Sequence, residues 1–223
     1  MAFKITQWLS MAPETGPLVA GALVATTISP LRSRTEKIVN RLASQYLPID
    51  AVIGGERKTA SVAMSDLSGY TALAGQNEKR ALLLAALLQQ QAARIAEKYD
   101  GHVVKSMGDA VMMEFESACG ACEALEALHA EFPVAAFAIG IPPLPLHSGV
   151  HHGEVTVGPD GDLYGQTVNL VARLQGVATD NQIVLSDEII AAASIATERV
   201  ESLGRCPLKN ISEPVACYAL RKL

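Results

Sequence analysis

The chain has 223 residues, of which 49% are hydrophobic, and a formal net charge of -5 at pH 7. This length and apolar content are sufficient for one well-formed core of ordinary domain size. The negative charge argues against a general nucleic-acid-binding protein, because neutralising phosphates requires a basic surface. Aromatic residues make up only 4%, which also argues against stacking platforms for single strands.

Residues 1–50 differ in composition from the remainder, and we expect them to form an N-terminal apolar and helical appendage. The stretch 17–30 has no charged residue, but it is shorter than the ~20 residues that a membrane-spanning helix needs. Extending it back to Trp8 includes Glu14. We therefore favour a buried or amphipathic helix in a cytoplasmic protein. A membrane anchor over residues 8–31, at the inner face of a membrane, and a dimerising helix or an autoinhibitory cap within residues 1–50 remain alternatives.

From residue 60, strand patterns alternate with helix patterns. ASVAMSD predicts a strand that ends at Asp66. Asn77 is expected to cap a long helix that runs through Lys98, because its Leu and Ala run gives one broad apolar face. HVVKS and AVMMEF, residues 102–106 and 110–115, predict a hairpin around Gly108.

The second half of the chain continues this alternation. A helix is expected from about Ser117 to Glu131, followed by strands over 134–141 and 146–158. A third helix is expected over 164–178, then a strand over 182–186 and two closing strands at 198–204 and 215–223. Strand, helix, hairpin, helix and strand around one sheet is the ferredoxin-like topology. The sequence therefore predicts an α+β fold with a ferredoxin-like βαββαβ core.

Cys119 and Cys122 have C-x-x-C spacing but do not lie at a strand-to-helix turn, where a thioredoxin-like redox pair would be, and a zinc site built from all four cysteines is the less favoured alternative. Cys119 and Cys122 lie within a predicted helix, and Cys206 and Cys217 do not have the close spacing of cysteines in a zinc knuckle. We interpret all four as reduced thiols. The adjacent histidines 151 and 152 lie within a predicted strand and are interpreted as structural.

Two aspartates stand where predicted strands end. Asp66 precedes the small and hydroxyl residues SGYT, and Asp109 follows Gly108 in the predicted hairpin turn. Two carboxylates on adjacent strand ends would form a hard-oxygen site suited to Mg²⁺ or Mn²⁺ held jointly with substrate phosphates. Taken alone, each aspartate is more readily explained as a turn or cap residue than as a metal ligand, and periodicity does not establish that the two meet in space.

Four segments, in order, resemble the class III adenylyl and guanylyl cyclase homology domain: SDLSGYTAL, VVKSMGDAVMMEF, LHSGVHHGEV and DLYGQTVNLVARL. The closing LGRCPLKNISEPVACYAL resembles that family's last strands. The resemblance covers roughly residues 58–221, and several separated motifs in the right order make it highly specific.

The resemblance implies a role for each matching residue. Asp66 and Asp109 match the metal-binding aspartates, with the Leu67 carbonyl as a backbone ligand, for two Mg²⁺ or Mn²⁺ ions per site. Lys105 and Asp162 match the pair that recognises the purine. The resemblance also places the ribose-orienting asparagine at Asn169, the transition-state arginine at Arg173 and, less closely because LKN replaces the usual LKG, the phosphate-binding lysine at Lys209.

These roles imply an adenylate cyclase that converts ATP to 3′,5′-cyclic AMP and pyrophosphate at a homodimer interface. Asp162 can accept a hydrogen bond from adenine N6 and Lys105 can donate to N1, which favours ATP. Cyclisation of GTP or of a pyrimidine nucleotide, and a nucleotide-binding regulatory module without turnover, remain alternatives. His147 departs from the family, which often has arginine there.

Overall fold

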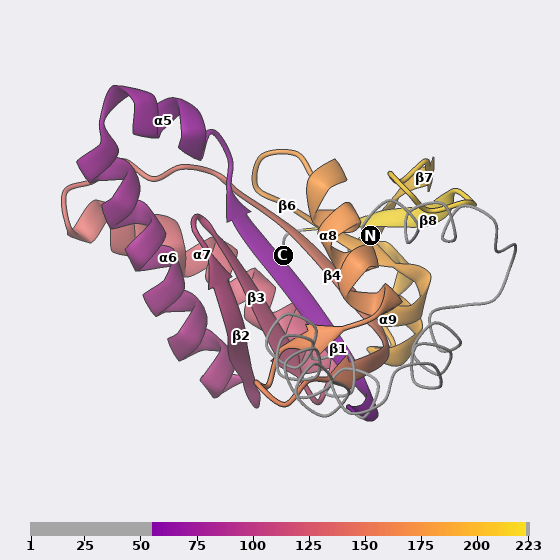
Figure 1. Ribbon diagram of the computed structural model, residues 1–223. Helices are drawn as coiled ribbons and strands as arrows, with labels where there is room; N and C mark the ends of the chain where they lie inside the picture. The colour runs from indigo at the N-terminus through magenta and orange to yellow at the C-terminus, as the bar shows by residue number, and fades with distance from the viewer. Residues whose placement is uncertain (1–54, 222–223) are drawn as a thin grey trace, which may run out of the picture. The chain divides into compact units, whose positions relative to one another are not determined.

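The computed structural model describes residues 55–221, and these fold around one eight-stranded sheet (Figure 1). The sheet consists of β1 (Glu56–Leu67), β2 (Gly101–Met107), β3 (Ala110–Phe115), β4 (Leu146–Val157), β5 (Leu163–Tyr164), β6 (Gln182–Ser186), β7 (Val200–Cys206) and β8 (Val215–Leu220). The helices are α5 (Tyr70–Gln76), α6 (Glu78–Lys98), α7 (Ala118–Ala138), α8 (Gln166–Val177), α9 (Asp187–Ala192) and the 3-10 turn η1 (Thr197–Arg199). The predictions for residues 1–50 lie outside the described part of the chain.

The strand order confirms the predicted ferredoxin-like core. Along the sheet the order is β2-β3-β1-β4-β6-β8-β7, and β5 pairs with β4. The first four of these strands are joined by antiparallel pairing, and in the chain they follow the sequence β1, α6, β2, β3, α7, β4. β6 then extends the sheet parallel to β4, and β8 and β7 complete it.

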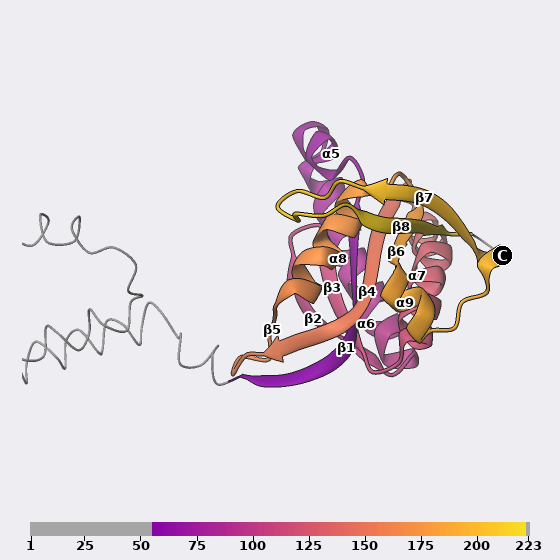
Figure 2. The same cartoon turned by 90° about the vertical axis from the view of Figure 1, so that its right-hand side faces the viewer.

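Helices cover both faces of the sheet, α6 and α7 on one face and α8 on the other (Figure 2). The alternation of β1 assigns its side chains to these faces, because successive side chains of a strand point in opposite directions. Ala63 and Leu67 join the core cluster beneath α6 and α7. Val62 and Met64 join the cluster beneath α8. Asp66 follows the same period and therefore lies on the α8 side.

Side-chain caps start the two long helices. The Asn77 side chain accepts a hydrogen bond from the Arg80 amide at 3.0 Å, which confirms the predicted cap of α6. Ser117 caps α7 in the same way through the amide of Gly120. Such a cap satisfies one of the amides that the first turn of a helix leaves unpaired.

The predicted strand over residues 134–141 is wrong, because α7 continues through Pro133 to Ala138. Leu128, Phe132 and Ala136 are fully buried at helical spacing, so the apolar stripe that holds α7 on the sheet runs past the proline. Proline costs a helix one hydrogen bond, and here the packing outweighs that cost. The exposed Val134 and Phe137 lie on the solvent side of the last turns.

The four cysteines are free thiols, with Cys119 and Cys122 in α7 as predicted. Burial raises the pKa of Cys122 to about 12, so this thiol is protonated and unreactive at neutral pH. None of the helices between residues 55 and 221 is long and apolar enough to cross a membrane.

Candidate active site

Asp66 and Asp109 lie side by side where β1 ends next to the β2–β3 turn. In the pairing of β1 with β3, Asp66 stands opposite Ala110, the residue that follows Asp109. Asp109 is near enough for its charge to raise the pKa of Asp66. Leu67, the last residue of β1, follows with a buried side chain.

The surroundings of Asp66 disfavour the negatively charged form of its carboxyl group. Burial, followed by the charge of Asp109, raises the pKa of Asp66 to about 6, against the opposing effects of His147 and of the Leu67 amide. Removing a carboxylate from water and placing another beside it both disfavour the charged form. A divalent cation between the two aspartates would reverse this effect, so the residues present fit a metal site.

Two side chains that the sequence did not single out for the site also contact Asp66. His147, opposite Asp66 in the β1–β4 pairing, places its Nε2 3.5 Å from Asp66 Oδ2. Gln175, on α8, donates from Nε2 to the same oxygen at 3.4 Å. The other oxygen, Oδ1, accepts from the Leu67 amide at 2.8 Å. Gln175 follows Val171 by four residues, about one helical turn. This spacing is the signal in the sequence that could have indicated that Gln175 faces the sheet.

Lys105 and Asp162 form an ion pair, with 2.6 Å between Nζ and Oδ2. A bulge between Val103 and Lys105 shifts the register of β2, so that Lys105 stands opposite Met112 and faces the α8 side. Asp162 is the last residue of a turn over residues 158–162. The Gly158 amide donates a hydrogen bond to the Asp162 carbonyl oxygen at 2.8 Å and so closes this turn. Both side chains remain partly exposed, so a ligand can reach them.

Asn169 and Arg173 lie one turn apart on α8, Asn169 exposed and Arg173 half-buried. Within residues 55–221 the Arg173 guanidinium has no hydrogen-bond or ion-pair partner. Gln175 is about 200° around the helix from Arg173, since each residue turns the helix by about 100°. By the same measure Asn169 is about 120° around the helix from Gln175, so Gln175 contacts Asp66 while Asn169 and Arg173 face other directions.

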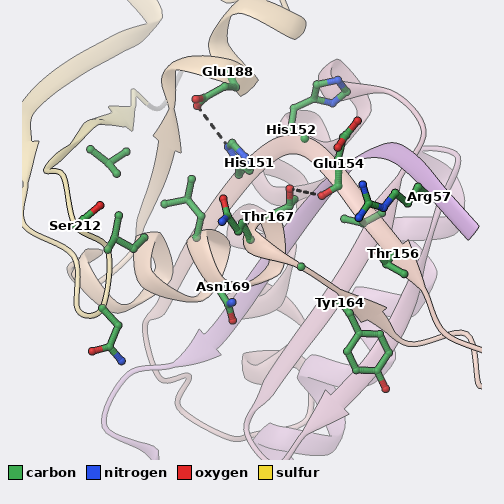
Figure 3. A pocket seen from close by; sticks show the side chains of 18 residues that line it. Arg57, His151, His152, Glu154, Thr156, Tyr164, Thr167, Asn169, Glu188 and Ser212 are labelled. Atoms are coloured by element: carbon green, nitrogen blue, oxygen red, sulfur yellow. Dashed lines mark hydrogen bonds and ion pairs between the residues drawn. The ribbon is translucent and has the colours of Figure 1, made fainter. Parts of the chain in front are cut away.

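Asn169 also lines a cavity of about 950 Å³ on the α8 side of the sheet. Figure 3 shows Thr167 and Asn169 of α8, Tyr164 of β5 and residues of β4 around it. The turn after β7 contributes Asn210 to the lining. Lys209, the residue before it, is exposed in that turn and does not line the cavity.

Two of the three histidines in β4, His151 and His152, hydrogen-bond to neighbouring strands. His151 Nδ1 lies 2.7 Å from Ser186 Oγ, and His152 Nδ1 lies 2.9 Å from Ser61 Oγ. In the described part of the chain no group of three His, Cys, Asp or Glu side chains could hold a metal ion. A metal at the aspartate pair would therefore need further oxygen ligands, which a bound triphosphate would supply.

Comparison with known proteins identifies the family. The model of the adenylate and guanylate cyclase catalytic domain matches residues 54–222. The putative adenylate cyclase 3 of Rhizobium meliloti (strain 1021) is 33% identical over 165 residues, which cover 71% of this chain but 27% of that protein. This chain thus spans about a quarter of that relative's length.

Solved structures agree on the fold. The adenylyl cyclase CyaB of P. aeruginosa has a TM-score of 0.67 and 27% identity, covering 75% of this chain and 96% of that one. The guanylyl cyclase Cya2 has a TM-score of 0.65 and 24% identity, covering 74% of this chain and 93% of that one. With the family model matching residues 54–222, the chain belongs to the adenylate and guanylate cyclase catalytic domain family, the class III nucleotidyl cyclases.

Proposed function

We propose that this protein is an adenylate cyclase that converts ATP to 3′,5′-cyclic AMP and pyrophosphate. The observation that carries the proposal is the placement of Asp66 and Asp109, two carboxylates brought near each other at one end of the sheet. Membership of the cyclase family supports nucleotide cyclisation. The R. meliloti relative, named an adenylate cyclase, supports ATP over GTP.

The aspartate pair would hold two Mg²⁺ or Mn²⁺ ions together with the Leu67 carbonyl. Two carboxylates and a backbone carbonyl are hard oxygen donors, and Mg²⁺ is commonly bound by one or two carboxylates plus substrate phosphates. When bound, the ions neutralise charge on the triphosphate and activate the attacking hydroxyl. The raised pKa of Asp66, caused by burial and by Asp109, supports a site that is completed by cations.

Cyclisation forms a bond from the ribose O3′ to the α-phosphorus and breaks the bond from that phosphorus to the pyrophosphate oxygen. Catalysis of such a transfer depends on positioning and electrostatic stabilisation. Arg173 would stabilise the developing negative charge with its planar donors, and its guanidinium has no competing partner within residues 55–221. Asn169 would orient the ribose, and the exposed Lys209 would bind the terminal phosphates.

The site would be shared between two copies of the chain. Gln175 contacts Asp66 from one side of α8, whereas Arg173 lies about 200° and Asn169 about 120° around the helix from Gln175. Neither side chain therefore faces the aspartates of its own protomer. A second protomer, related by two-fold symmetry, would bring its own α8 to complete each site.

Base recognition would rest on Lys105 and Asp162. Their ion pair holds a donor and an acceptor side by side, which matches adenine N1 and N6 respectively. Guanine presents the reverse pattern, an acceptor at O6 and a donor at N1. The pair therefore favours ATP, with GTP and pyrimidine nucleotides as alternative substrates.

A regulatory module that binds a nucleotide without turnover is the second candidate. Such a domain would not require the carboxylate pair and Arg173 together. Both are present here, with Asp66 near Asp109 and Arg173 on α8, on the side away from Gln175. These features favour catalysis.

Mixing two inactive variants tests the shared site. Asp66→Ala and Asn169→Ala should each lower the rate on the order of 10²–10³-fold, because each removes one part of both sites. A mixed dimer keeps one intact site, so subunit exchange should restore roughly a quarter of the wild-type rate. Recovery below a few per cent, with both variants folded and dimeric, would contradict the proposal.

A further inference from the structure

Two side chains outside the proposed catalytic set restrain one carboxylate oxygen of Asp66. Gln175 Nε2 lies 3.4 Å from Asp66 Oδ2 and 2.9 Å from His147 Nδ1. His147 Nε2 lies 3.5 Å from the same Asp66 oxygen. The amide nitrogen of Gln175 carries two hydrogens, so it can donate to the carboxylate and to the ring at once.

Both the side chain and the backbone of Gln175 hold the His147 ring beside Asp66. His147 Nδ1 lies 2.9 Å from Gln175 Nε2 and 3.3 Å from the Gln175 carbonyl oxygen. The Nε2 atom of the ring faces the Asp66 carboxylate. The Leu67 amide restrains the other oxygen at 2.8 Å, so the carboxylate is held from three directions.

The position of Gln175 is fixed by close packing of α8 on β4. A Cβ atom at Gly149 would lie 2.4 Å from the Gln175 nitrogen and 2.7 Å from the Val171 carbonyl oxygen. Both are backbone atoms that cannot move aside without shifting the helix. Glycine at 149 therefore lets the backbone of α8 approach the strand, and this approach brings the Gln175 side chain to Asp66.

We propose that Gln175, supported by His147, is a positioning residue that orients Asp66 for metal binding in its own protomer. This inference rests on the proposed function. It gives α8 two separate tasks, since its sheet side serves the aspartates of its own protomer and its outer side serves the site completed with the partner. Groups that orient metal ligands typically contribute 10–100-fold to metal affinity or activity.

The mixing experiment separates these two tasks. In a mixed dimer of Asp66→Ala and Asn169→Ala chains, the intact site takes Asp66 from the Asn169→Ala chain and Asn169 from the other chain. Gln175→Met, which keeps the side-chain length and removes the donor, is added to one chain at a time. In the Asn169→Ala chain it should lower the recovered rate by about 10-fold or more. In the Asp66→Ala chain it should lower the rate less than about 2-fold, because Asp66 is already absent there.

The outcomes distinguish the inference from the function that it rests on. No recovery with Gln175 intact in both chains would contradict the shared site itself. If Gln175→Met lowers the recovered rate equally in either chain, Gln175 has a general structural role in α8. If Gln175→Met leaves the recovered rate unchanged in both chains, Gln175 has no role. Either result would overturn the positioning role. Gln90→Met, at an exposed position on α6, is the matched control and should leave recovery unchanged.

Metal binding provides a readout that does not depend on turnover. Manganese binding in the presence of a non-cyclising ATP analogue can be followed by the loss of the free Mn²⁺ signal in electron paramagnetic resonance. Gln175→Met should weaken Mn²⁺ binding by about 10-fold or more, and His147→Phe should weaken it in the same direction. Unchanged Mn²⁺ affinity in a folded, dimeric Gln175→Met protein would overturn the inference.

Discussion

The surroundings of Asp66 disfavour the charged form of its carboxyl group. The free energy of unfolding should therefore depend on whether Asp66 is protonated. Its folded-state pKa of about 6 lies above the ordinary value of 3.8, chiefly through burial and the neighbouring Asp109. A carboxyl whose pKa rises on folding stabilises the fold while protonated. Its contribution is therefore complete below about pH 4 and is lost as the pH rises through about 6.

Asp66→Asn should consequently stabilise the metal-free protein at neutral pH. Removing the opposed charge is expected to raise the free energy of unfolding by about 1–2 kcal/mol above pH 7, with little change near pH 4. Urea denaturation of both proteins in a chelating buffer at several pH values measures this. A destabilised Asp66→Asn protein at neutral pH would show that the charge is already compensated by His147 and Gln175.

Lys105 should matter for the substrate and little for the fold. Its ion pair with Asp162 is partly exposed, and such pairs contribute on the order of 0–1 kcal/mol to stability. Lys105→Met is expected to shift the melting temperature only slightly and to lower kcat/KM for ATP by about 10-fold or more. Thermal melts together with steady-state kinetics test this, and a large loss of stability with unchanged kinetics would contradict it.

At the scale of elements, two glycines near the contact of α8 with the sheet should respond oppositely to alanine. At Gly149 the added Cβ would meet the backbone of α8, whereas at Gly176 it would meet nothing within 4 Å. Gly149→Ala should destabilise by about 1–3 kcal/mol through overpacking. Gly176→Ala should stabilise by about 0.5–1 kcal/mol, because alanine is the better helix former. Chemical denaturation compares the two, and a stabilising Gly149→Ala would contradict the close packing.

The element pattern was predictable where local signals agreed. The strand through Asp66 and the cap at Asn77 both follow from local sequence, and both are found, with the strand ending one residue later than predicted, at Leu67. The strand predicted after Pro133 was wrong because tertiary packing of α7 overrides the local effect of proline. The contact of Gln175 with Asp66 spans 109 positions, and the register shift that turns Lys105 toward α8 comes from a bulge. Neither has a local signature.

At the scale of the whole molecule, activity should depend on assembly. If each site needs residues from two protomers, the rate per chain should fall on dilution as dimers dissociate. Measuring the specific rate over a range of protein concentrations, alongside the mass in solution, tests this. A rate per chain that stays constant for a demonstrated monomer would place the complete site in one copy.

The central claim is that the Asp66–Asp109 pair, with divalent cations, cyclises ATP. The most direct measurement incubates the purified protein with Mn²⁺ and each of the four nucleoside triphosphates in turn, and identifies the products by mass spectrometry. The account predicts 3′,5′-cyclic AMP and pyrophosphate from ATP, at a rate well above that with the other three, and no product from Asp109→Asn. Absence of any cyclic nucleotide from the folded, dimeric protein, or equal turnover by Asp109→Asn, would contradict it.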